Sequence, residues 1–191
     1  MKKKLLTFLM LFLIFISINL YANSQNDVFV VKINGEINNA TVSYVEDSVK
    51  KAEEAKADAI IFEIDTYGGQ VIAAEKIKNK IIDTDVRTIA YVNNKAESAG
   101  VLLTIACEKV YMSKTATIGS AETIPKTEKN ISFWRSILRN TAEYRDRDEK
   151  IIEAMADSDV VIEGLSEKGK LINLTSSESL KYKISDGIAD D

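Results

Sequence analysis

A serine set among small residues is the side chain of this sequence best suited to nucleophilic chemistry. Ser98 lies in the segment Ala96–Gly100, which follows an apolar run and precedes a helix-like one. Folds expose nucleophiles and free backbone amides at such junctions. The sequence contains no histidine, so the hydroxyl proton would have to pass to another base. Lysine is the best remaining candidate, because a desolvated amine can become neutral near neutral pH and an arginine cannot.

A second motif, Asp65–Gly69, follows the preceding apolar run and would complete the site. The amide of Ala99 would point into the same space as the Ser98 hydroxyl, and the Gly68–Gly69 turn would add a second donor for an oxyanion. Glycine suits this turn because a Cβ would block close approach of the backbone. Taken alone, the serine motif is more often a helix start with serine as its cap.

Strand-like apolar runs alternate with helix-like patterns, which predicts an α/β domain with mainly parallel strands. Both motifs follow strands at their carboxyl ends, the edge of an open sheet where ligands bind. The expected strands are residues 28–33, 59–64, 88–92 and 109–112. Helical spacing of apolar residues marks the segments 42–52, 71–81, 133–138 and 151–155.

The later part of the chain carries weaker signals. Residues 122–130 contain the single proline and are expected to form a loop, and the charged stretch 143–150 is expected to be a solvated face. Thr175 and Glu178 have the spacing of a capping box for a short helix, which Gly187 is expected to close.

Residues 1–22 have the pattern of an export signal, with a lysine-rich start, an apolar stretch and small residues before a cleavage site. An uncleaved N-terminal membrane anchor is the alternative, although the apolar stretch is short for a span of about 20 residues. Either interpretation places the remaining domain, residues 23–191, outside the cytoplasm.

Composition excludes several classes of function. The chain has a formal net charge of −4 and no lysine- or arginine-rich block, so nucleic acid is not an expected partner. The single cysteine, Cys107, lies in an apolar run and is expected to be a buried packing residue. With no histidine and one cysteine, no metal-ligand pattern is present, and neither a metal nor an organic cofactor is expected.

Four segments taken together resemble the protease domain of NfeD-type proteins, which are membrane-associated serine proteases of the ClpP/crotonase fold. The segments are residues 65–69, 90–100, 116–121 and 174–187, within a resemblance that covers residues 27–190. The resemblance implies one domain of stacked β-β-α units. It also implies a Ser-Lys dyad without cofactors, substrates with hydrophobic segments, a stomatin-type partner at the membrane, and assembly into a homo-oligomer.

In that family the lysine of the dyad precedes a helix that ends in an arginine-containing turn. The corresponding turn here is Arg145–Asp148, and counting back through the helix gives Lys129, with Lys126 as the alternative base. A lysine base must be uncharged, and the neighbouring aromatic pair Phe133–Trp134 would provide the required desolvation.

The sequence departs from the family pattern at three places. Tyr67 stands where proline is usual, Glu97 stands before the serine where a small residue is usual, and Asp146 and Asp148 replace a glycine and an asparagine. The Glu97 carboxylate would oppose an oxyanion, hold the lysine protonated, or point to solvent.

Two hypotheses from different classes therefore remain. The leading one is an extracytoplasmic endopeptidase in which Lys129 takes the proton of Ser98 while the amides of Gly69 and Ala99 hold the oxyanion. The alternative is a catalytically inactive module that binds peptides or acts as a scaffold. A crotonase-type acyl-CoA enzyme is a weaker third interpretation, since no CoA-binding pattern is recognisable.

Overall fold

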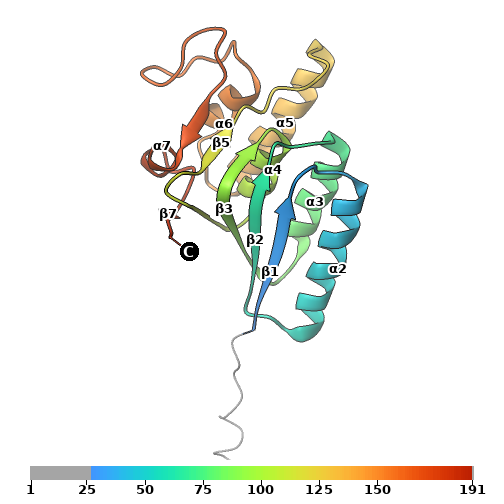
Figure 1. Ribbon diagram of the computed structural model, residues 1–191. Helices are drawn as coiled ribbons and strands as arrows, with labels where there is room; N and C mark the ends of the chain where they lie inside the picture. Colours follow the sequence, from blue (N-terminus) through green and yellow to red (C-terminus); the bar gives the residue numbers. More distant parts are fainter. Residues whose placement is uncertain (1–26, 191) are drawn as a thin grey trace, which may run out of the picture.

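The computed structural model describes residues 27–190. Its central element is a mainly parallel sheet, with helices α2 and α3 along one face (Figure 1). The predicted signal or anchor, residues 1–22, lies outside this described part. Within it, no helix has both the length and the apolar character needed to cross a membrane. In chain order the elements are β1 (Val28–Asn34), α2 (Asn39–Ala55), β2 (Ala59–Thr66), α3 (Val71–Asp83), β3 (Arg87–Glu97), α4 (Ala99–Ala106), β4 (Lys109–Met112), β5 (Thr117–Gly119), α5 (Glu128–Tyr144), α6 (Glu149–Ala156), β6 (Asn173–Thr175), α7 (Ser176–Lys181) and β7 (Gly187–Ile188).

The sheet has the strand order β1-β2-β3-β4-β7, and all of these neighbours are parallel. The four strands expected from the sequence are confirmed, with β3 longer than expected because it continues to Glu97. On one edge β3 pairs first with β4 over residues 89–92 and then with β5 over residues 95–97. The end of β3 is therefore held by β5, which pairs in turn with β6 in antiparallel fashion.

Helix α2 illustrates how local sequence sets an element. Asn38 accepts hydrogen bonds from the first amides of the helix, and Thr41 completes a capping box. The helix ends at Ala55 and is capped by Lys56, which adopts the left-handed conformation. Its buried face consists of residues at helical spacing, Val42, Val45, Val49 and Ala52.

Phe62 lies at the centre of β2 and is fully buried in the core that the helices and the sheet share. Truncating it to alanine removes apolar contacts and leaves a cavity, so we expect a loss of about 3–5 kcal/mol in the free energy of unfolding. Urea denaturation would measure the loss. Phe133→Ala is the matched control, because that ring is 51% exposed and its truncation should cost less than about 1 kcal/mol.

Three sequence expectations about the later part of the chain were wrong in detail. Gly187 does not close the last helix, because α7 ends at Lys181 and Gly187 begins β7 beside β4. Helix α5 begins at Glu128, inside the expected loop, because the Thr127 hydroxyl caps it. Arg147 is buried rather than solvated, because its guanidinium donates to the Ile184 carbonyl oxygen at 2.7 Å.

Candidate active site

Ser98 lies at the junction of β3 and α4 in a strained backbone conformation. Its φ of 54° and ψ of −119° lie in a region that residues with a Cβ rarely adopt. The amide of Ser98 donates to the Gly119 carbonyl oxygen at 3.0 Å, and its own carbonyl accepts from the Val101 amide at 3.0 Å. The hydroxyl makes no capping hydrogen bond. Ser98 is therefore not an ordinary helix cap, and its half-buried hydroxyl is available for other chemistry.

Gly68 lies directly against Ser98. A Cβ on Gly68 would lie 2.6 Å from the Ser98 Cβ and 3.0 Å from both the Ser98 Oγ and the Ala99 nitrogen. The φ of Gly68 is also positive, at 104°. Its amide donates to the Thr66 Oγ1 at 2.9 Å and its carbonyl accepts from the Ile37 amide, so both backbone groups are already used. Gly68 therefore contributes no free amide to the site. Its lack of a Cβ allows the backbone of this turn to approach Ser98 closely.

Two backbone amides beside Ser98 have no acceptor among residues 27–190, those of Gly69 and Ala99. Gly69 is fixed by its bridge to Ile37, whose carbonyl accepts from Gln70 at 2.8 Å. Both residues line one pocket of about 420 Å³ together with Ser98. The pair predicted from the sequence to hold an oxyanion is therefore adjacent to the nucleophile and unoccupied by protein acceptors.

Residues 122–124 and Trp134 also line this pocket. Trp134 is buried and donates from its indole nitrogen to the Ala121 carbonyl oxygen at 2.7 Å, which fixes its ring. Two lining residues are strongly exposed, Ile124 at 97% and Tyr67 at 79%. Thr123 has a buried hydroxyl without a partner in the described part of the chain, a polar group that sequence reasoning missed. The pocket thus combines exposed apolar surface with unpaired polar groups.

The two candidate lysines lie outside the lining of this pocket. Lys129 is exposed in the first turn of α5, and the predicted desolvation by aromatic side chains is not found, since Trp134 faces the core and Phe133 is half exposed. Lys126 is exposed too, with its Nζ 2.5 Å from the Glu122 Oε1 and 3.3 Å from the Ser158 Oγ. The hydrogen bond that Lys126 donates to the Glu122 carboxylate raises the pKa of Lys126, which favours its charged form.

Glu97 is hydrogen-bonded to neighbouring strands and does not hold either candidate lysine protonated. Its Oε1 accepts from the Thr117 hydroxyl at 2.9 Å, and its two oxygens accept from the Asn173 amide nitrogen at 3.0 and 2.8 Å. It forms no ion pair with either candidate lysine. The carboxylate is engaged with β5 and β6 instead.

Lys95 was not singled out by sequence reasoning, although it lies three residues before Ser98. Its Nζ is 3.0 Å from the Asp65 Oδ1 and 4.5 Å from the centroid of the Tyr67 ring. The hydrogen bond to Asp65 raises the pKa of Lys95, so this lysine stays charged and is unsuited to act as a base. Its place over the ring orients Tyr67 at the mouth of the pocket.

The thiol and the possible metal ligands of the described residues were the other groups considered for chemistry. Burial raises the pKa of the Cys107 thiol to about 12, which confirms it as a packing residue. No cluster of three or more acidic, cysteine or histidine side chains within residues 27–190 is arranged to hold a metal ion.

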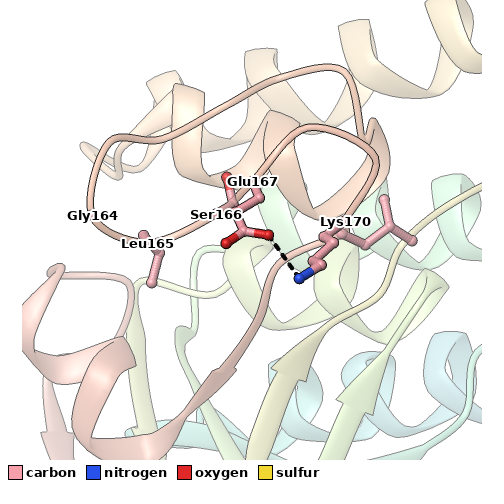
Figure 2. Close-up of a pocket in the computed structure, with 6 residues that line it drawn as sticks. Gly164, Leu165, Ser166, Glu167 and Lys170 are labelled. Carbon is pink, nitrogen blue, oxygen red and sulfur yellow. Dashed lines mark hydrogen bonds and ion pairs between the residues drawn. The ribbon is translucent and has the colours of Figure 1, made fainter.

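A second pocket lies in the loop between α6 and β6 and is built differently (Figure 2). Glu167 and Lys170 form an ion pair of 2.8 Å across it. Its serine, Ser166, already accepts a hydrogen bond from the Ile162 amide at 3.0 Å. The hydroxyl of Ser166 is thus tied to its own loop, whereas Ser98 lies beside two amides that have no acceptor in the described chain. The Ser98 pocket is therefore the candidate active site.

Residues 27–191 match the protein family described as NfeD1b, N-terminal domain. The chain is 29% identical over 192 residues to Membrane protein NfeD1b of Bacillus subtilis, covering 97% of this chain and 44% of that protein. It is 27% identical over 195 residues to Membrane-bound protease PH1510 of Pyrococcus horikoshii, covering 95% and 41%. The chain spans about two fifths of the length of these curated relatives.

Solved structures confirm the predicted fold. A serine-to-alanine mutant of the 1510-N membrane-bound stomatin-specific protease is 25% identical with a TM-score of 0.79, over 88% of this chain and 82% of that chain. A lysine-to-alanine mutant of that protease in complex with a substrate peptide is 24% identical with a TM-score of 0.76, over 88% and 78%. ClpP1 from Listeria monocytogenes is 20% identical with a TM-score of 0.68, over 85% and 91%. The resemblance found in the sequence is likewise confirmed.

Proposed function

This chain belongs to the family of the NfeD1b N-terminal domain, and we propose that it is a serine endopeptidase with Ser98 as its nucleophile. The observation that carries the proposal is the strained Ser98 beside two backbone amides that have no acceptor in the described chain. Backbone strain of this kind persists only where the surrounding structure enforces it, and it clusters at active sites. A relative is named a membrane-bound protease, which supports the same chemistry.

The proposed reaction begins when the Ser98 Oγ attacks a peptide carbonyl carbon and its proton passes to a neutral lysine. The carbonyl oxygen becomes an oxyanion, to which the amides of Gly69 and Ala99 donate. Each such donor typically lowers the barrier by about 3 kcal/mol. Collapse of the intermediate breaks the C–N bond, and the leaving amine takes the proton from the lysine. Water then hydrolyses the acyl-enzyme through the same lysine.

Lys129 is proposed as this base in preference to Lys126. Lys126 is held by the Glu122 carboxylate, and its raised pKa makes it a poor proton acceptor. Lys129 has no ion-pair partner within residues 27–190. Because Lys129 does not line the pocket, the substrate-bound state has to bring its amine to Ser98. Closure over an apolar peptide would also supply the missing desolvation.

The substrate is proposed to be a hydrophobic segment of a membrane-associated protein, bound in extended form in the Ser98 pocket. The exposed side chains of Tyr67 and Ile124 support an apolar substrate, because large apolar groups beside a site favour apolar ligands. A stomatin-type partner, a homo-oligomeric state and an extracytoplasmic location belong to the same proposal. Of these three, the stomatin-type partner is supported by the 1510-N relative, which is named a membrane-bound stomatin-specific protease.

Substitution of the nucleophile tests the proposal. Ser98→Ala is expected to lower hydrolysis of a pool of hydrophobic peptides by at least about a thousandfold and to abolish labelling by a fluorophosphonate probe. Ser166→Ala, which changes a serine in the other pocket, should leave both unchanged. Mass spectrometry of the labelled protein would identify the modified residue, and a label on any serine other than Ser98 would refute the assignment.

The second candidate is an inactive peptide-binding module, favoured by the position of both lysines outside the pocket. It predicts equal peptide affinity for wild type and Ser98→Ala, together with no probe labelling of either. Isothermal titration calorimetry with the same peptides would compare the two affinities. A protease differs from this module in that its wild type, but not Ser98→Ala, also releases cleaved product.

A further inference from the structure

Glu97 joins the ends of three strands immediately before Ser98. In the sheet Glu97 of β3 pairs with Gly119 of β5, and Gly119 pairs with Asn173 of β6. The Glu97 carboxylate follows the same path, accepting from the Thr117 hydroxyl at 2.9 Å and from the Asn173 side-chain nitrogen at 2.8 and 3.0 Å. The Asn173 nitrogen also lies 3.0 Å from the Ser120 Oγ. We call the Glu97 and Asn173 pair the Glu97–Asn173 clamp.

The two residues of the clamp flank Gly119, whose carbonyl oxygen holds the Ser98 backbone. The Gly119 carbonyl oxygen accepts the Ser98 amide at 3.0 Å. Gly119 is itself packed tightly against β6, because a Cβ on it would lie 2.3 Å from the Ile172 carbonyl oxygen. Strands β5 and β6 are only three residues long, so few ladder hydrogen bonds fix them. The Ser120 amide adds one backbone bond next to Gly119, to the Ile172 carbonyl oxygen at 3.0 Å. The side-chain bonds of Glu97 to Thr117 and Asn173 supplement this small set and tie together the two strands that flank Gly119.

We infer that Glu97 is a positioning residue that keeps Ser98 in its strained conformation through Asn173 and Gly119. A carboxylate suits this task, since hydrogen bonds to an ionised acceptor are stronger than neutral ones. Glu97 does not line the Ser98 pocket and acts through the backbone of β5 and β6. As far as it concerns catalysis, the inference rests on the proposed protease function. The geometric part, that the clamp holds the Ser98 backbone, stands without it.

Truncation of Glu97 should lower turnover more than substrate affinity. For Glu97→Ala we expect kcat on hydrophobic peptides to fall about tenfold to a hundredfold while KM changes less than threefold, because a small displacement of a nucleophile costs this much in rate. The matched control is Glu63→Ala. Glu63 is also a strand glutamate with two side-chain partners, Lys32 and Asn93, but it lies in β2 away from Ser98. An unchanged kcat in a folded Glu97→Ala would overturn the inference.

Exchanging the two groups of the clamp separates positioning from general destabilisation. Asn173→Asp places a second carboxylate against Glu97 and should reduce kcat as much as Glu97→Ala does. The double variant Glu97→Gln with Asn173→Asp again pairs one amide with one carboxylate. The hydrogen bond then runs in the opposite direction, from the amide at position 97 to the carboxylate at position 173. The double variant is expected to recover most of the lost rate. A double variant no faster than Asn173→Asp alone would contradict a clamp that works through this hydrogen bond.

Hydrogen exchange gives a readout that does not depend on activity. If the clamp holds Gly119 against Ser98, the Ser98 amide should exchange about tenfold to a hundredfold faster in Glu97→Ala, because its acceptor is no longer fixed. Exchange in the central strand β2 should stay as in wild type. If wild type hydrolyses no peptide but the Ser98 amide exchanges faster in Glu97→Ala, the protease function is refuted and the clamp is retained. Unchanged Ser98 exchange would refute the clamp whatever the activity.

Discussion

Gly68→Ala is expected to reduce peptide hydrolysis and probe labelling by about a hundredfold to a thousandfold. The added methyl group would meet the Ser98 Cβ at 2.6 Å, and the Ser98 Oγ and the Ala99 nitrogen at 3.0 Å. The collision would displace the nucleophile and one oxyanion donor together. The kcat/KM for a hydrophobic peptide and the rate of fluorophosphonate labelling would measure the loss.

A matched glycine separates this collision from the cost of backbone strain. Gly35 also has a positive φ, 84°, but a Cβ there would meet nothing within 4 Å. Gly35→Ala should therefore lower stability by about 1 kcal/mol through strain and leave hydrolysis unchanged. If Gly68→Ala retained wild-type hydrolysis, the close approach of the two backbones would have no part in catalysis.

Much of the fold could be predicted from the sequence because its signals are local. The apolar strands around Ile60 and Val110 are bounded by polar residues, and the buried face of α2 repeats at helical spacing. The short elements near the C-terminus depended on distant partners. Gly187 starts a strand because β4 lies beside it. Arg147 can be buried because its guanidinium donates hydrogen bonds to the Ile184 carbonyl oxygen and the Asp186 carboxylate.

The candidate site was predictable where strand ends converge. Ser98, Gly69 and Ala99 follow adjacent parallel strands, so the topology alone brings them together. The roles of other residues depend on contacts that no spacing encodes. The Gly68 amide is taken by the Thr66 hydroxyl, and Glu97 finds its partner Asn173 at a separation of 76 residues.

Lys129→Ala is expected to lower kcat by about a hundredfold to ten-thousandfold, the range over which a general base contributes. Lys126→Ala should cost less than about tenfold, because the Glu122 carboxylate keeps that amine charged. The control is Lys150→Ala, which removes an exposed lysine from the first turn of α6, the position that Lys129 holds in α5. Single-turnover kinetics with an activated ester would measure the acylation step directly.

The pH dependence distinguishes the two lysines independently of these truncations. Since only a neutral amine accepts the Ser98 proton, the rate should rise with pH. Glu122→Gln removes the carboxylate that raises the pKa of Lys126, so it lowers that pKa towards the ordinary value. With Lys129 as the base, the midpoint of the pH–rate profile should not move in Glu122→Gln, whatever the change in absolute rate. A midpoint displaced to lower pH would instead identify Lys126 as the proton acceptor, because Glu122→Gln lowers the pKa of Lys126 and not that of Lys129.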